Sequence, residues 1–152
     1  LIIETGRLIV RDGAFISIDT LGPGKGGTLL VKAADSVEVI GTSPDGKAPS
    51  ALFAPTSPGT TGDGGDLMIE TGRLIVRDGA QIGAGTFGQG KAGTLTVRAR
   101  DSVEVIGTTA DGQIPSGLFT SAQRGSTGDG NDLMIETGRL IVRDGAVVSV
   151  NS

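Results

Sequence analysis

Aspartates in two glycine-rich turns are the residues of this chain with the clearest potential for metal chemistry. The turns occupy residues 62–66 and 128–132. Their candidate calcium ligands are Asp63, Asp66, Asp129 and Asp132. A calcium ion takes six or more oxygen ligands, which calcium-binding nonapeptide repeats collect from consecutive turns. Because each turn here lacks a tandem copy, a corner leading into a strand is the favoured interpretation, and no cofactor is predicted.

Charged side chains that recur at fixed positions offer a second kind of chemistry. Glutamate returns at Glu4, Glu70 and Glu136, with arginines and other charged residues between them. If Glu70 and Arg98 lie on adjacent strands, their opposite charges stabilise the pairing and oppose wrong registers. The alternative is a charged groove that binds acidic glycans. The solvent-exposed, paired arrangement is favoured over that groove.

A carbohydrate-active enzyme is the enzymatic alternative. Such a centre uses a cluster of carboxylates, or a calcium site with a basic residue, within a groove. In this chain the Asp and Arg residues return with every repeat, and the sugar-stacking residues Trp and Tyr are absent. We therefore predict that the protein is not an enzyme.

Composition narrows the class of protein further. The chain has 152 residues, of which 27 are Gly and 4 are Phe, with no Cys and no His. This composition excludes disulfides, thiolate metal sites and histidine bases. The net charge of −4 disfavours nucleic acid and anionic membrane surfaces as partners. No apolar stretch approaches the length that membrane insertion needs.

A sequence repeat positions all of these residues. The block 4–14 returns at 70–80 and at 136–146, which is a period of 66 residues without insertion or deletion. We assign the chain to one repeat segment, 1–152, with repeat 1 over 1–66, repeat 2 over 67–132 and a partial repeat 3 over 133–152. Both ends fall inside a repeat, so we expect a fragment of a longer array built by stacking one structural unit.

Each period divides into two related halves, and each half reads as three short strands joined by corners. In the second repeat these strands are expected at 67–70, 74–76 and 80–82, and then at 95–98, 103–105 and 117–119. Apolar and other residues alternate with the period of a strand, and Asp-Gly pairs suit the corners. The residues expected to point into the core are Leu8, Val10, Val37, Val39, Leu74, Val76, Val103, Val105, Leu140 and Val142.

Short strands with inward aliphatic residues predict an all-β fold, a parallel β-helix or β-solenoid. We expect two coils per 66-residue repeat and about four to five coils in the chain. The competing interpretation is a β-sandwich with long hairpins, which would pair its strands antiparallel and leave the strict period unexplained.

The motif combination resembles a known family. Gly-Thr-Leu-Thr-Val-Arg-Ala stands at 93–99, Asp-Ser-Val-Glu-Val-Ile-Gly at 101–107, Arg-Asp-Gly-Ala at 77–80, and a glycine-rich Thr-x-Gly-x-Gly-x-x-Gly segment at 86–93. This pattern is similar to the repeat region of filamentous-haemagglutinin-type exoproteins, the two-partner secretion adhesins, in the cyanobacterial branch. The resemblance covers essentially the whole chain. The family's Asn-rich secretion domain is not in this sequence, so the repeats alone carry the expectation of export.

The resemblance implies a right-handed helix, export through an outer-membrane barrel transporter, and an extracellular or outer cell-surface location. The expected function is that of a rigid shaft in a filamentous adhesin. One alternative is a self-assembling extracellular fibre or matrix protein whose partner is itself, through end-to-end stacking. A carbohydrate-binding or carbohydrate-active β-helix is less favoured. Cell-surface or matrix glycans are the candidate ligands. The candidate binding surface consists of residues 54–61 and 120–127, where the repeats differ. Relaxed constraint on solvent-exposed loops is the favoured explanation of that variation.

Overall fold

The described part of the chain is built from β-strands. The structure is a computed structural model that describes residues 2–17, 28–46, 48–56, 66–86, 94–122 and 133–151, and no helix occurs within them. The strands are β1 (Ile2–Arg11), β2 (Phe15–Ser17), β3 (Thr28–Ile40), β4 (Ala51–Thr56), β5 (Asp66–Arg77), β6 (Gln81–Thr86), β7 (Leu95–Ile106), β8 (Gly117–Ala122), β9 (Leu133–Thr137), β10 (Leu140–Arg143) and β11 (Val147–Asn151).

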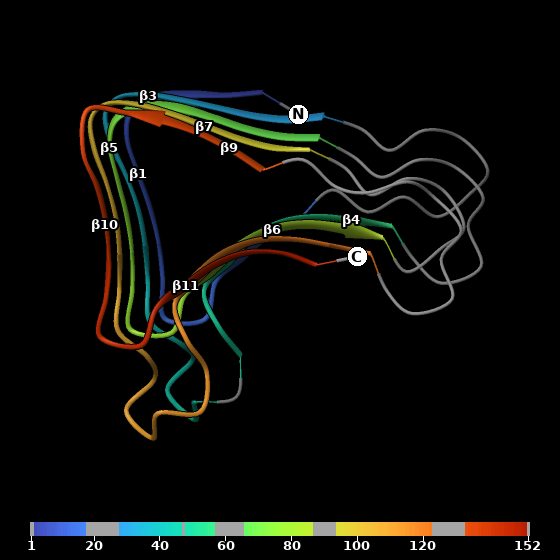
Figure 1. Ribbon diagram of the computed structural model, residues 1–152, viewed down its shortest axis with the longest axis vertical. Helices are drawn as coiled ribbons and strands as arrows, with labels where there is room; N and C mark the ends of the chain where they lie inside the picture. The colour runs from blue at the N-terminus through green and yellow to red at the C-terminus, as the bar shows by residue number, and fades with distance from the viewer. Residues whose placement is uncertain are drawn as a thin grey trace.

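The strands form two parallel sheets. The first sheet has the order β1-β3-β5-β7-β10, with β9 also paired to β7, and the second has the order β2-β4-β6-β8-β11. The chain therefore crosses the first sheet, then the second, and returns beside its earlier strand (Figure 1). Among the named strands of the described residues, no antiparallel pair of the kind that a β-sandwich requires occurs; only isolated bridges, such as Thr42 with Pro49, are antiparallel.

The register brings equivalent residues of the repeat side by side. In the first sheet Leu67 of β5 pairs with Leu95 of β7. In the second sheet Leu52 pairs with Ile82, which pairs in turn with Leu118. Each inward aliphatic residue thus meets a similar residue on the adjacent strand, and aliphatic columns run across both sheets.

The long strands of the first sheet bend at their middle. The segments 67–70 and 74–76, predicted as separate strands, belong to one continuous strand, β5, whose register shifts between Thr71 and Arg73. At this point one residue of β1 or β5 faces two residues of β3 or β7, which is the arrangement of a β-bulge. Gly72 permits the close approach of the strands, because a Cβ there would lie 2.7 Å from the carbonyl oxygen of Asp35. The bend carries the first sheet around two sides of the molecule (Figure 1).

The core lies between the sheets and consists of aliphatic side chains. The predicted inward residues that are buried are Val10, Val37, Val39, Leu74, Val76, Val103 and Val105. Ile75 and Glu104, which the alternation places on the outer face, are half-buried. Leu52, Ile82 and Leu118 close the core from the second sheet, and each is 0% exposed.

Of the four predicted core residues in the outermost strands, Val10 is buried and the other three are buried less completely. Leu8 of β1 is half-buried and packs against the core, whereas Leu140 and Val142 of β10 are 48% and 39% exposed. β1 and β10 are the outer strands of the first sheet, so each has a neighbour on one side only. The prediction that Leu140 and Val142 are core residues is therefore wrong here, because alternation predicts the direction of a side chain and not the presence of a covering strand.

The same substitution at two equivalent positions of the repeat should lower the free energy of unfolding by different amounts. Leu74→Ala should lower the free energy of unfolding by about 2–5 kcal/mol, because it leaves a cavity in a close-packed core. Leu140 stands one repeat later and is 48% exposed, so Leu140→Ala should cost less than about 1 kcal/mol. Chemical denaturation of both variants measures the difference, and equal losses would contradict this assignment of the core.

Candidate functional site

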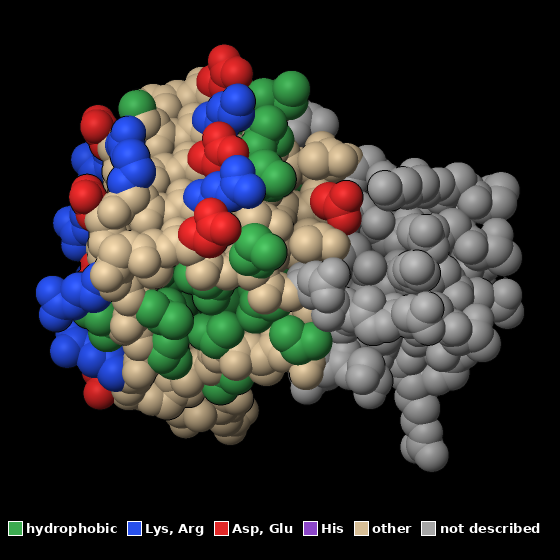
Figure 2. Space-filling view, turned by 45° about the horizontal axis from the view of Figure 1, so that its top comes forward, with side chains coloured by type: hydrophobic (Ala, Val, Ile, Leu, Met, Phe, Trp, Pro, Cys, Tyr) green, Lys and Arg blue, Asp and Glu red, His purple; other side chains and the backbone are tan. Residues whose placement is uncertain are grey.

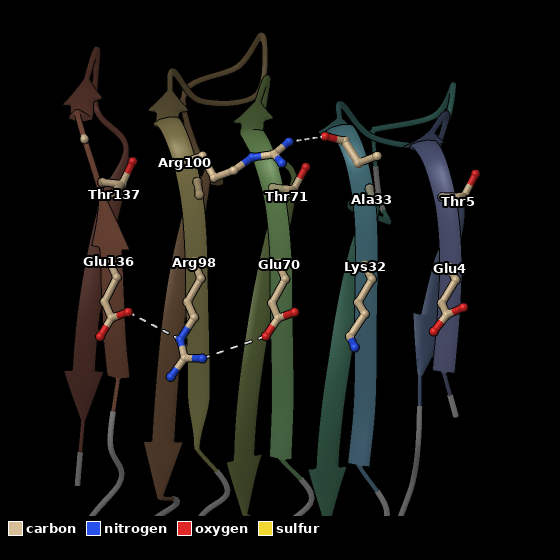
Figure 3. A pocket seen from close by; sticks show the side chains of 13 residues that line it. Glu4, Thr5, Lys32, Ala33, Glu70, Thr71, Arg98, Arg100, Glu136 and Thr137 are labelled. Carbon is tan, nitrogen blue, oxygen red and sulfur yellow. Dashed lines mark hydrogen bonds and ion pairs between the residues drawn. The ribbon is translucent and has the colours of Figure 1, made fainter.

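An open groove of about 660 Å³ crosses the strands of the first sheet beside their bend. β1, β3, β5 and β9 each contribute one charged side chain to the groove and β7 contributes two, and small side chains make up most of the remaining lining (Figure 3). The parallel register carries both kinds of lining residue from strand to strand. The groove is therefore a direct product of the repeat.

The charged residues of the groove form a row of alternating sign. The register places Glu4, Lys32, Glu70, Arg98 and Glu136 side by side on successive strands (Figures 2 and 3). Arg98 Nη1 lies 3.8 Å from Glu70 Oε1, and Arg98 Nε lies 3.3 Å from Glu136 Oε2. The predicted proximity of Glu70 and Arg98 is confirmed. The Arg98 side chain is 51% exposed and pairs with two glutamates of the row, so an acidic ligand would compete with these glutamates for Arg98.

The neighbouring row of the groove consists of alternating threonine and alanine residues. The threonines are Thr5, Thr71 and Thr137, which alternate with Ala33 and Ala99 in the register. Each threonine hydroxyl donates a hydrogen bond to the backbone carbonyl two residues later, at 3.3, 3.3 and 3.2 Å respectively. These hydroxyls therefore stabilise the bend of the strand.

Arg100 breaks the periodicity of the groove. Ala34 stands at the equivalent position of the first repeat. Arg100 Nη2 donates a hydrogen bond to the carbonyl oxygen of Ala34, reaching across β5 (Figure 3). Gly72 lies under this side chain, and a Cβ there would be 3.2 Å from Arg100 Nη2. The repeat pattern did not predict this contact, although the difference between Ala34 and Arg100 at equivalent positions was the available signal.

A second set of ion pairs follows the bend. Arg7 Nη2 lies 2.8 Å from Glu38 Oε2, and Arg73 Nη2 lies 2.8 Å from Glu104 Oε2. The hydrogen bond to Glu104 raises the pKa of Arg73 above its ordinary value. The glutamate side chains are only 17% and 21% exposed, so the arginines partly cover them. These pairs link adjacent strands in the way that the recurring charges predicted.

Aspartates at the corners and strand ends accept hydrogen bonds from nearby backbone N–H groups. Asp111 accepts hydrogen bonds from the Thr109 hydroxyl and from Gln113 N, and these bonds lower its pKa, the Thr109 bond most strongly.

Of the candidate calcium ligands, Asp66 accepts a hydrogen bond from Thr94 N at 3.1 Å. Asp63, Asp129 and Asp132 lie outside the described residues, as does most of the candidate surface at 54–61 and 120–127. Within the part of the chain that the structure describes, no group of three or more acidic residues is placed to hold a metal ion.

Comparisons with known proteins give no match to a family model, a curated protein or a solved structure. Among the described residues the structure has no helix of the length and apolarity that a membrane crossing requires.

The geometry of the charged row predicts a measurable coupling between two of its residues. A double-mutant cycle on Arg98 and Glu136, with alanine at each position, should give a coupling energy of about 0.2–1 kcal/mol, typical of exposed ion pairs. The coupling should fall in 1 M salt, because exposed charges are screened there.

Lys32 and Glu4 provide the matched control for this cycle. They are register partners, but no ion pair joins them in the described structure, so their coupling should be smaller. Urea denaturation of the unsubstituted protein and of the single and double variants of both cycles gives both values. A coupling for Lys32 and Glu4 that equals or exceeds the Arg98 value would contradict the described pairing.

Proposed function

We propose that this chain is a segment of the rigid shaft of a secreted or surface-displayed structural protein of the filamentous adhesin type. Its fold in this proposal is a right-handed parallel β-solenoid with two coils per 66-residue period and about four to five coils. The observation that carries the proposal is the parallel pairing of strands of the first sheet with the corresponding strands of the neighbouring half-repeats. The role is mechanical rather than catalytic.

Parallel pairing of equivalent strands supports a shaft because it makes length additive. Each strand of the two sheets donates and accepts backbone hydrogen bonds in the direction in which the strands are stacked. A further period would place its residues on the same columns and would add two strand spacings, about 9.6 Å, to the stack. Stiffness follows because the aliphatic core continues without interruption through every added unit.

The charged row supports a shaft in which coils with an acidic residue at this position alternate with coils that carry a basic residue there. Acidic residues of β1 and β5 face basic residues of β3 and β7. A slip by one strand would place like charges opposite each other, whereas a slip by a full period would restore every pair. The period of 66 residues is therefore the unit in which the shaft is copied.

Export and adhesion enter the proposal through the family resemblance of the repeats. We propose an outer-membrane barrel transporter as the secretion partner and an extracellular or outer cell-surface location. Cell-surface or matrix glycans remain the proposed external ligands.

Chains with different numbers of repeats test the shaft. Two, six and ten tandem copies of 67–132 should form slender rods that lengthen by about 9.6 Å per copy, with a diffraction spacing near 4.8 Å along the rod. Electron microscopy with power spectra measures both quantities. Compact particles whose size does not follow copy number would overturn the solenoid and the shaft together.

Two deletions provide the matched control for register. Removal of 67–132 takes out a full period, so Lys32 would face Glu136 as it now faces Glu70. Removal of 67–94 takes out a single strand pair, so Lys32 would face Arg98 and Glu38 would face Glu104. This second variant should unfold at a lower denaturant concentration because like charges oppose across its new pairing.

Location is tested on cells of the source organism. Antibodies raised against the folded segment should label intact, unpermeabilised cells or their extracellular matrix. Labelling that appears only after permeabilisation would contradict the extracellular role while leaving the shaft architecture standing.

A further inference from the structure

The corners that follow β1 and β5 are built on Asp-Gly pairs. Asp12 and Asp78 have φ angles of 58° and 57°, in the left-handed region where aspartate is one of the few tolerated non-glycine residues. The glycines that follow have φ angles of 83° and 91°. A Cβ on these glycines would lie 2.6 Å from Ser43 and 2.5 Å from Thr109. The geometry of the corner therefore requires glycine directly after the aspartate.

Asp-Gly is also the aspartyl pair that rearranges most readily, because glycine has no side chain to hinder the reaction. The glycine backbone nitrogen attacks the carbon of the protonated side-chain carboxyl group. A carbon–nitrogen bond forms, the carboxyl hydroxyl and the amide proton leave as water, and a cyclic imide results. Water then opens the imide at either carbonyl, which restores aspartate or produces isoaspartate with one extra methylene in the main chain.

A buried serine holds the attacking nitrogen in both corners. Gly13 N donates a hydrogen bond to Ser50 Oγ at 2.9 Å, and Gly79 N donates one to Ser116 Oγ at 2.8 Å. Both serines are 0% exposed. Ser116 Oγ also donates a hydrogen bond to the carbonyl oxygen of Ile106 at 2.9 Å, so this hydroxyl is engaged as donor and acceptor at once.

Backbone hydrogen bonds fix the position of these serines. Ser116 N donates to the carbonyl oxygen of Gly107 at 2.9 Å, and the Ser116 carbonyl accepts from Val147 N at 2.9 Å. Ser50 makes the two equivalent bonds at the same distances. To turn toward the aspartate, the glycine nitrogen must break its hydrogen bond to the hydroxyl of a serine whose backbone is held in place.

We propose that Asp12 and Asp78 are latent sites of isoaspartate formation, and that Ser50 and Ser116 guard them by holding the nitrogen of the next residue. Each guard comes from a segment 37 residues further along the chain. The protection therefore exists only when adjacent strands are stacked in register. An extra main-chain methylene at the corner would shift the strand that follows, so the guard preserves the register on which stacking depends. This chemistry is independent of whether the protein is a shaft.

Two reciprocal variants test the guard. The unsubstituted protein, Ser116→Ala and Ser50→Ala are incubated folded at neutral pH and elevated temperature. Peptide mapping by liquid chromatography and mass spectrometry then quantifies isoaspartate at Asp12 and at Asp78 separately. Ser116→Ala should raise the rate at Asp78 by about two- to twelvefold, the range that corresponds to loss of one hydrogen bond, and leave Asp12 unchanged. Ser50→Ala should give the reverse pattern.

Comparison of the rates at Asp12 and Asp78 distinguishes a local effect of the replaced serine from a general loosening of the fold. The proposal would be overturned if the rate of isoaspartate formation did not rise at the aspartate whose serine was replaced. It would also be overturned if the rate rose equally at both aspartates in each variant. If either variant does not fold, amide hydrogen exchange of the unsubstituted protein decides. Gly13 N and Gly79 N should exchange as slowly as the ladder amides of the flanking strands, and rapid exchange at these corners would overturn the guard.

Discussion

In-register parallel pairing is the constraint on which the rest of this structure depends. Each strand lies beside strands that carry equivalent residues, so one choice of residue is repeated across the sheet as a column. A column of Ile16, Leu52, Ile82, Leu118 and Val148 crosses the second sheet. The core, the charged row, the groove and the guarded corners are all columns of this kind. A side chain is therefore stabilised by its own counterparts, which explains how a core with almost no aromatic residues is closed.

The same pairing explains why the second repeat contributes two different strands to each sheet, β5 and β7 to the first and β6 and β8 to the second. Identical charges stacked on every strand would repel, so the column of Glu70 alternates glutamate with lysine or arginine, and other exposed columns alternate a charged residue with an uncharged one, as with Arg73 beside Ser36. The inward columns carry no charge and need no such alternation. The two halves of the repeat both place an aliphatic residue at each inward position, as with Val37 beside Leu74. Electrostatics on the surface, and not packing in the core, therefore distinguishes the two halves. The bulge adds a second difference, because only β3 and β7 contribute the extra residue at the bend.

Much of this arrangement could be predicted from the sequence, because alternation and repetition are local signals. They correctly indicated the buried valines such as Val103, the partly exposed Glu104 between two inward residues, and the proximity of Glu70 to Arg98. The continuity of β5 through its bend could not be predicted, because a bulge is defined by the strand beside it. The contact of Arg100 with Ala34 was missed for a related reason: it joins positions 66 residues apart at a site where the repeats differ.

That contact also has a mechanical consequence. Ladder hydrogen bonds join immediate neighbours, whereas the Arg100 side chain ties β7 to β3 across the intervening β5. When the stack is pulled along its length, the two interfaces on either side of β5 would share the load with this tether, and neither could open alone without stretching it. A single arginine thereby makes the separation of β5 from either neighbour depend on a side-chain contact as well as on the backbone ladder.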